Sequence, residues 1–169
     1  MIRLSTEKFF IADPYNEKHI QLFEQFENKH SISTTATSRL KEIASLYSKT
    51  EYQIITKESN NVEQILFLES NDSIVDTCHI QGEKDIKTCT LYFSPINNLT
   101  RNRPLLTLSL DYAFNVLGME EIFVATTTTD KNLRENLESR GFENLGEDGG
   151  NIIFLKEKEI IQKTGRIIQ

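Results

Sequence analysis

Few side chains in this 169-residue sequence are suited to acid–base, nucleophilic or metal chemistry. The three histidines, His19, His30 and His79, are scattered, and even with the two cysteines they offer too few ligands for a metal site. No Ser/His/Asp or Cys/His spacing is typical of a nucleophilic enzyme, and no glycine-rich nucleotide loop is present. His79 lies in a predicted strand and could act as a base, although a single histidine in a strand is more often structural.

The two cysteines, Cys78 and Cys89, flank the segment 81–85 (QGEKD). If that segment is the tip of a hairpin, a symmetric register places the two cysteines opposite each other on neighbouring strands. In a reducing cytosol we expect two free thiols that pack as small apolar groups, and a redox pair is the alternative.

The charge balance argues against general binding to nucleic acids or anionic membranes. The chain has 19 Lys+Arg against 25 Asp+Glu, a net charge of -6, whereas such binders normally carry a basic face. Its first residues mix charged with apolar types, unlike a signal peptide, and no run of about 18 apolar residues could span a membrane. The sequence therefore predicts a single cytoplasmic domain over residues 1–169, with 38% hydrophobic residues for one core.

Periodicity predicts a strand over residues 3–12, followed by a helix over 17–30 through Ile20, Phe23 and Phe26. After the polar stretch 31–38, a second helix is expected to end near Thr50. Four short segments rich in β-branched and aromatic residues then predict an antiparallel meander, at 52–56, 63–69, 73–80 and 86–93.

The C-terminal half alternates helices and strands. Pro104 and Gly118 bound a predicted helix, because proline suits the first helical turn and glycine the stop. A strand over 120–129, a helix begun by Thr129 or Asp130 and stopped by Gly141, a loop at 146–150 and a strand over 151–161 follow. The predicted fold class is a mixed α/β (α+β) domain with a mainly antiparallel sheet flanked by helices.

Residues 91–142 resemble the GNAT superfamily of N-acetyltransferases, in which a strand, a phosphate-binding turn, a long helix, a strand and a helix ending in Gly-Phe follow one another. Here these pieces are TLYFSP, INNLTRNR, PLLTLSLDYAFNVLGM, EEIFVA and DKNLRENLESRGF. The phrases LDYAFNVLGMEEIFV and LESRGF are similar to the ribosomal-protein and spermidine acetyltransferase branch. The N-terminal half matches only in the order of its elements.

The resemblance implies that acetyl-CoA is the co-substrate. Its pantetheine arm would lie where two strands separate and bond to main-chain groups of Leu91 and Phe93. Its pyrophosphate would bind the turn before the next helix, where backbone N–H groups and the helix dipole favour anions. That turn is formed by Thr100, Arg101, Asn102 and Arg103. Asp130 takes the place of an asparagine that touches the cofactor in relatives, and the alternative is an ordinary helix cap.

The phosphate turn departs from the family pattern, because no glycine occurs between Gly82 and Gly118. Two registers, one residue apart, stay open for the positions that the pattern gives to Arg or Gln, Gly, and Gly or Ala. Arg101 and Arg103 could contact phosphate through charge-assisted bonds, or they could be solvated charges while the turn is reshaped and the site lost. The first register places Asn97, Thr100 and Asn102 there, and the second places Asn98, Arg101 and Arg103.

No catalytic residue can be assigned from the resemblance. Many relatives place a glutamate midway along the strand before the turn, but residues 87–90 hold no carboxylate. Leu137 stands where some relatives have the tyrosine that protonates the leaving thiolate. Glu83 and Asp85 lie near the presumed hairpin tip, and Tyr92 borders the expected cleft but is also a typical core residue.

The first hypothesis is an acetyl-CoA-dependent N-acetyltransferase of a primary amine, either a small molecule or a protein N-terminus, by direct transfer in a ternary complex. The acceptor would enter between the loops 31–38 and 146–150, and the negative net charge favours a cationic amine. The alternative is a GNAT-like regulatory or interaction module without activity. The C-terminal tail, with Ile160, Ile161, Ile167 and Ile168, could complete the sheet or dock on a second subunit of a homodimer.

Overall fold

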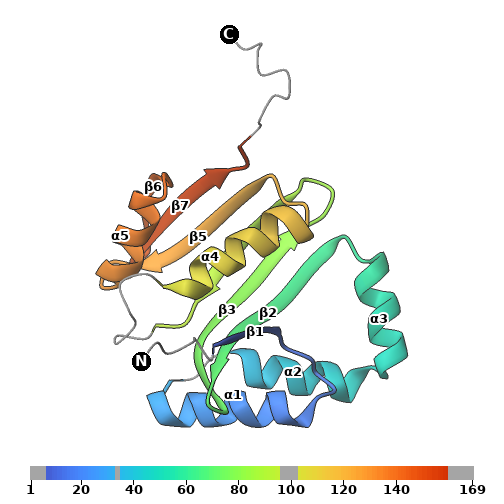
Figure 1. The fold of residues 1–169 in the computed structure, drawn as a ribbon. Coiled ribbons are helices and arrows are strands. Elements are labelled where there is room, and N and C mark those ends of the chain that lie inside the picture. The colour runs from blue at the N-terminus through green and yellow to red at the C-terminus, as the bar shows by residue number, and fades with distance from the viewer. Residues whose placement is uncertain (1–6, 33–34, 96–102, 160–169) are drawn as a thin grey trace, which may run out of the picture.

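A seven-stranded sheet with the order β1-β2-β3-β4-β5-β7-β6 forms the centre of the molecule (Figure 1). The computed structural model describes residues 7–32, 35–95 and 103–159. Strands β4 and β5 run parallel, and every other pairing in the sheet is antiparallel. The predicted mixed fold with a mainly antiparallel sheet is thus confirmed. The strands are β1 (Lys8–Ile11), β2 (Asn61–Ser70), β3 (Ser73–Glu83), β4 (Thr88–Phe93), β5 (Glu121–Thr127), β6 (Glu143–Asp148) and β7 (Asn151–Glu157).

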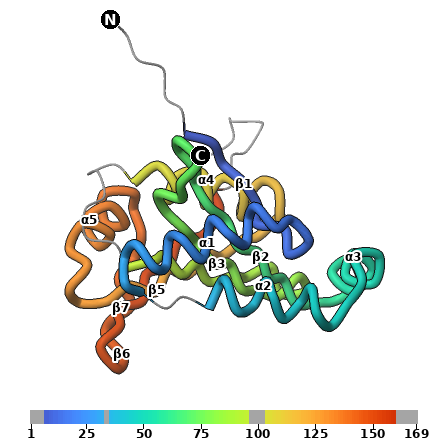
Figure 2. The backbone as a smooth tube through the Cα atoms, turned by 90° about the horizontal axis from the view of Figure 1, so that it is seen from below, coloured from blue at the N-terminus to red at the C-terminus, as the bar shows by residue number. Residues whose placement is uncertain are grey.

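Two helical layers cover the sheet on opposite faces. The helices are α1 (Glu17–His30), α2 (Thr35–Leu46), α3 (Lys49–Glu58), α4 (Pro104–Asp111), which continues into a π-helical turn η1 (Tyr112–Val116), and α5 (Lys131–Ser139). Helices α4 and α5 share one core with alternate residues of β2 to β5, such as Leu66, Ile80 and Leu91. Helices α1 and α2 lie side by side (Figure 2). They share a second core with the other face, including Ile65 and Phe67.

The predicted helices of the C-terminal half are confirmed, together with their stop signals. Helix α4 begins with Pro104, and the π-turn ends before Gly118, which has φ +74°. Helix α5 is capped by Asp130 and ends before Gly141, which has φ +83°. Both glycines adopt the left-handed conformation that terminates helices and that other residues rarely tolerate.

The segment 52–56 was predicted as a strand, and this prediction is wrong, because it lies inside α3. The reason is local: Ser48 and Glu51 form a reciprocal capping box that starts a helix three residues earlier. The polar stretch predicted as a loop over 31–38 is also partly helical, since α2 begins at Thr35.

The hairpin between β3 and β4 turns later than predicted, and the cysteines therefore do not face each other. Its tip lies at residues 84–87, with Lys87 at φ 52°, and Glu83 pairs with Thr88. Cys78 is opposite Phe93, and Cys89 is opposite Gly82. Both cysteines are buried free thiols, as expected of small apolar groups.

Strand β6 was not predicted, since residues 146–150 were expected to form only a loop. It pairs with β7 at one edge of the sheet, and all six of its residues are exposed. Because neither of its faces is buried, the alternation of polar and apolar residues that identifies a half-buried strand is missing.

Candidate active site

The parallel strands β4 and β5 separate at their C-terminal ends. Their last paired residues are Tyr92 and Ala125, while Thr126 and Thr127 of β5 continue against β7. Phe93 is therefore the last residue of β4 and has no partner on β5 in the described ladder. A fork between two strands leaves main-chain groups free for a ligand to bind.

A cavity of about 220 Å³ lies in this fork. Tyr92, Phe93 and Pro95 border it on one side, and the end of β5 with Ala125 borders it on the other. Asp130 and Leu133, at the start of α5, also contribute to its lining. Its lining is largely apolar with a few polar groups, which is typical of a pocket that binds a small molecule or cofactor.

A larger cavity of about 430 Å³ lies on the sheet face that α1 and α2 partly cover. It shares Tyr92, Phe93 and Pro95 with the cavity in the fork. Tyr92 is 44% exposed and borders both cavities. The other lining residues are Thr35, Ala36, Ile65, Thr77, Cys78, His79, Gln81 and Ser94.

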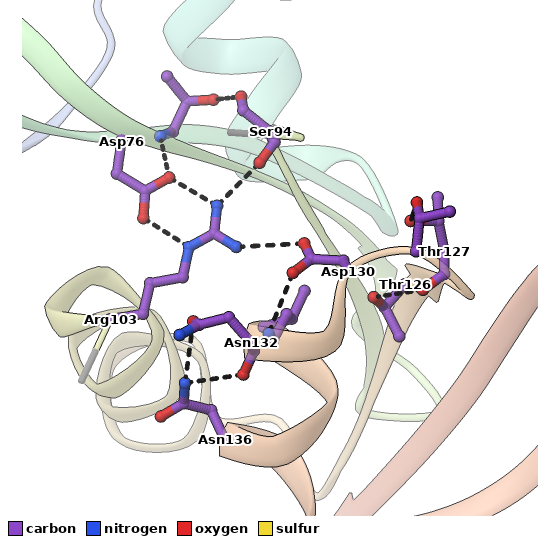
Figure 3. Close-up of polar contacts among 11 residues, drawn as sticks. Asp76, Ser94, Arg103, Thr126, Thr127, Asp130, Asn132 and Asn136 are labelled. Carbon is purple, nitrogen blue, oxygen red and sulfur yellow. Dashed lines mark hydrogen bonds and ion pairs between the residues drawn. The ribbon is translucent and has the colours of Figure 1, made fainter. Parts of the chain in front are cut away.

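Arg103, at the start of α4, turns its side chain into the protein, and Figure 3 shows the contacts that it makes. Its Nε and Nη2 atoms donate to the carboxylate of Asp76 at 2.8 and 2.9 Å, and Nη2 also donates to the carbonyl oxygen of Ser94 at 2.8 Å. The guanidinium carbon lies 4.9 Å from the centre of the Phe93 ring. Arg103 is 1% exposed, so the prediction of a solvated charge is wrong for this residue.

This ion pair ties Arg103, at the start of α4, to the neighbouring strands. Asp76 comes from the middle of β3, and Ser94 follows the end of β4. Burial raises the pKa of the Asp76 carboxyl, and the Arg103 guanidinium opposes that rise by stabilising the charged form. The buried pair therefore holds the end of β4 and the beginning of α4 in one fixed arrangement.

Asp130 fulfils the expected role of a helix cap, since its side chain accepts a hydrogen bond from the N–H of Leu133 at 3.1 Å. Its second carboxylate oxygen lies 3.8 Å from Nη1 of Arg103 (Figure 3). Because Asp130 also borders the fork cavity, it links the Arg103 cluster to that cavity.

The structure brings four of the predicted site residues together around the fork, namely Leu91, Phe93, Arg103 and Asp130. Leu91 pairs with Val124 inside the ladder, and Phe93 lies just beyond it. Thr100, Arg101 and Asn102 lie outside the described residues, as do Asn97 and Asn98 of the alternative registers.

Sequence reasoning missed Asp76 and Glu63. Asp76 interrupts the apolar alternation of SIVDTCHI at a position that faces the core, and such an acidic residue needs a buried partner. Glu63 forms a hydrogen bond with His79, at 3.1 Å between Oε2 and Nε2. Glu63 and His79 lie on the same face of the sheet, and only the strand register, which places Ile65 opposite His79, shows this.

Two further observations concern only residues 7–32, 35–95 and 103–159. Within these ranges, no group of three or more His, Cys, Asp or Glu side chains could hold a metal ion. No helix there combines the length and the apolarity needed to cross a membrane.

Comparison with known proteins rests on structure. No protein-family model matches the sequence, and no curated protein sequence matches it either. The N-acetyltransferase PseH of Campylobacter jejuni, in complex with acetyl coenzyme A, superimposes with a TM-score of 0.62 at 14% identity, over 90% of this chain and 99% of that one. The chain has the GNAT fold.

Two other N-acetyltransferases with this fold are similar over almost their whole length. Spermidine N-acetyltransferase of Vibrio cholerae gives a TM-score of 0.64 at 12% identity, over 90% of this chain and 94% of that one. Ribosomal-protein-S5-alanine acetyltransferase of Vibrio fischeri gives 0.62 at 12% identity, over 92% and 95%. The match extends into the N-terminal half, for which the sequence resemblance rested only on element order.

Proposed function

We propose that this protein is an N-acetyltransferase that transfers an acetyl group directly from acetyl-CoA to a primary amine, on a small molecule or a protein N-terminus. The observation that carries this proposal is the pair of cavities that meet at Tyr92, one in the fork of β4 and β5 and one on the face below α2. Two substrates bound in two adjoining cavities can react without a covalent enzyme intermediate.

The fork cavity fits the pantetheine arm of acetyl-CoA. Of the two strand residues expected to bind it, Phe93 lies beyond the ladder, so its main chain is the better placed, and Leu91 lies at the base of the fork. The Arg103 side chain binds Asp76, so we propose that Arg103 acts by holding the start of α4 and not by binding phosphate. We propose that Thr100, Arg101 and Asn102 bind the pyrophosphate. Asp130 borders the fork from the far side.

The larger cavity would hold the acceptor, and its chemistry favours a particular class. The described residues that line it include no carboxylate, and its polar groups are neutral hydroxyls, an amide and an imidazole. A second or third ammonium group on the acceptor would find no counter-charge in that lining. We therefore propose an amine on a neutral, partly apolar molecule or on a protein N-terminus, and not a polyamine.

Calorimetric titration with acetyl-CoA tests the cofactor proposal. We expect micromolar binding that is lost in Ala125→Leu, because a larger side chain on β5 fills the fork. Ala44→Leu, the same change on α2 outside both cavities, should bind as the wild type does. Absence of binding to the wild-type protein at millimolar acetyl-CoA would sink the enzyme proposal and leave the interaction module.

Release of the CoA thiol in the presence of single amines tests the acceptor class. We expect faster release of the CoA thiol with monoamines that have no other charged group than with spermidine at equal concentration. The reverse order would contradict the proposed acceptor class without affecting the cofactor proposal.

The predicted homodimer stays a proposal. The spermidine N-acetyltransferase of Vibrio cholerae is described as dodecameric, which is consistent with association among proteins of this fold. Light scattering of the purified chain measures its mass directly, and a value near 19.5 kDa would contradict self-association.

A further inference from the structure

Three side chains from three elements form a connected chain beside the acceptor cavity. Glu63 of β2 lies in the middle and accepts from Arg39 of α2, with 2.9 Å to Nε and 2.8 Å to Nη2, both at Oε1. Its other oxygen, Oε2, lies 3.1 Å from Nε2 of His79 on β3. His79 lines the cavity, whereas Glu63 is not one of its lining residues.

Strand register creates this arrangement. Ile65 pairs with His79 and Glu63 pairs with Gln81, so these side chains share the face that α2 covers. His79 is also directly opposite Tyr92 on β4, the residue at which the two cavities meet. The imidazole therefore lies one strand away from the fork, on the acceptor side.

The hydrogen bond to Glu63 fixes the state of the imidazole. Hydrogen bonds from His79, and to a smaller extent from Arg39, lower the pKa of the Glu63 carboxyl. Glu63 is therefore an ionised carboxylate, which can only accept a hydrogen bond from His79. Nε2 must then carry the proton that it donates, which leaves the lone pair of a neutral ring on Nδ1. Among the residues that the structure describes, Nδ1 has no hydrogen-bond partner.

We propose that His79, oriented by Glu63, is the general base that deprotonates the acceptor amine. This inference rests on the proposed function and adds a catalytic residue to it. A lone histidine in a strand is usually structural, but this one has a carboxylate on one nitrogen, a free second nitrogen and a cavity beside it.

The complete transfer consumes one acceptor ammonium and one acetyl-CoA and yields the acetylated amine, the CoA thiol and one proton. The acceptor ammonium gives one proton to Nδ1 of His79 and becomes a neutral amine. The amine nitrogen attacks the acetyl carbon, so that a C–N bond forms and the C–S bond breaks. The departing thiolate receives the second proton of the nitrogen through solvent, and His79 returns its own proton to solvent.

The charged groups that face the imidazole come from every element packed against it. Glu63 attracts a positive charge on the ring, and Arg39 offsets that attraction in part because it binds the same carboxylate. The titratable or charged groups around the ring are Glu63 on β2, Arg39 on α2, Tyr52 on α3 beside that pair, Tyr92 on β4 and the Cys78 thiol on its own strand.

The first test is the pH profile of kcat/KM with two amines whose own pKa values differ. We expect a rising limb that stays at the same pH for both amines, and His79→Gln should remove it and lower the rate about 10²–10⁴-fold. His30→Gln, on α1 and away from both cavities, is the matched control and should keep the wild-type profile. Glu63→Gln should lower kcat and leave the binding of acetyl-CoA unchanged, which loss of a purely structural contact would not do.

A second readout does not depend on turnover. The chain has three histidines, so the imidazole signals can be assigned by NMR from His19→Gln, His30→Gln and His79→Gln. We expect the neutral His79 ring to be the Nε2–H tautomer, because Nε2 donates to Glu63. The opposite tautomer, with the proton on Nδ1, would overturn the proposal.

The outcomes separate the two proposals. If the wild type fails to bind acetyl-CoA, the proposed function and the base fall together. If the wild type and His79→Gln both bind acetyl-CoA and show the same pH profile, only the role of His79 is overturned.

Discussion

The guanidinium of Arg103 and the carboxylate of Asp76 are joined by two parallel contacts, although the residues are 27 positions apart in the sequence. Each partner is almost fully buried. The pair connects the beginning of α4 to the middle of β3, and its further bond to the Ser94 carbonyl fixes the end of β4. The cluster therefore fixes the start of α4 against the ends of two strands.

Breaking this pair on one side should destabilise the protein strongly. We predict that Arg103→Met lowers the free energy of unfolding by about 3–5 kcal/mol, because it leaves the buried Asp76 carboxylate without its charged partner. The double variant Arg103→Met/Asp76→Leu should recover much of that loss. Urea unfolding of both measures the difference.

The exposed ion pair of Lys18 and Asp72 supplies the control for this prediction. Asp72→Asn should cost about 0–1 kcal/mol, since solvent screens that pair and asparagine tolerates the local φ of 61°. If Arg103→Met were as mild as Asp72→Asn, the cluster would not hold the start of α4 in place.

Gly82 has no room for a side chain. A Cβ atom there would lie 2.5 Å from the Thr88 carbonyl oxygen and 2.6 Å from the Cβ of Cys89. We predict that Gly82→Ala destabilises the protein by about 1–3 kcal/mol through overpacking between β3 and β4. Thermal unfolding measures this cost, and the neighbouring exposed Glu83→Ala should leave the melting temperature almost unchanged.

The Glu63 carboxylate should make the free energy of unfolding decrease in acid. Its pKa is lowered below the ordinary 4.5, chiefly by the hydrogen bond from His79. The unfolded chain therefore binds the proton more readily, so this contribution is complete above pH 4.5 and is lost as the pH falls through the lowered pKa. Unfolding free energies at neutral and acid pH measure it.

Two variants sharpen that measurement. In Glu63→Gln the loss of stability between neutral and acid pH should be smaller than in the wild type, whereas Glu83→Gln at the exposed end of β3 should behave as the wild type does. Equal acid sensitivity in all three proteins would show that Glu63 contributes nothing to it.

The buried cysteines should be unreactive in the native state. Burial raises the pKa of Cys89 to about 12 and that of Cys78 still further, so neither thiol forms the reactive thiolate at neutral pH. We predict that a thiol reagent modifies neither residue in buffer and both in denaturant. Rapid native labelling would contradict this and would also disturb any assay that counts CoA thiols.

Helix α3 should open without the rest of the protein. None of its residues is buried, and its start is held by the capping box of Ser48 and Glu51 and by the Tyr15 hydroxyl, which donates to the Tyr47 carbonyl at 2.8 Å. Ser48→Ala should cost about 1 kcal/mol, seen as faster amide exchange in α3 with little change in global melting. Ser45→Ala in α2 is the matched control and should leave the exchange of α3 unchanged.

Much of the fold could be predicted because it depends on local signals. The apolar spacing of α1, the proline and glycine that bound α4, and the Gly141 stop of α5 are all read within a few residues. The prediction of a strand at 52–56 was wrong because it gave more weight to the β-branched residues than to the capping signal at Ser48. Helix α3 lies on the surface, where packing is weak and the cap determines the local structure.

The site could be predicted only in part, for a physical reason. The fork and Phe93 follow from the resemblance of one continuous segment, but Arg103 with Asp76 and His79 with Glu63 depend on strand register. A shift in the hairpin tip from 81–85 to 84–87 changes every partner across β3 and β4, as the misplaced cysteines show.

The exposed strand β6 has a consequence for behaviour at high concentration. Its outer edge offers unpaired main-chain groups in the described chain, and such an edge can recruit a strand from another molecule into a growing aggregate. Glu143, Glu147 and Asp148, with the bulge between Asn144 and Gly146, place repelling charge and a distortion along that edge. This strand therefore protects the edge of the sheet against association, because its carboxylates repel the same strand of a neighbouring molecule.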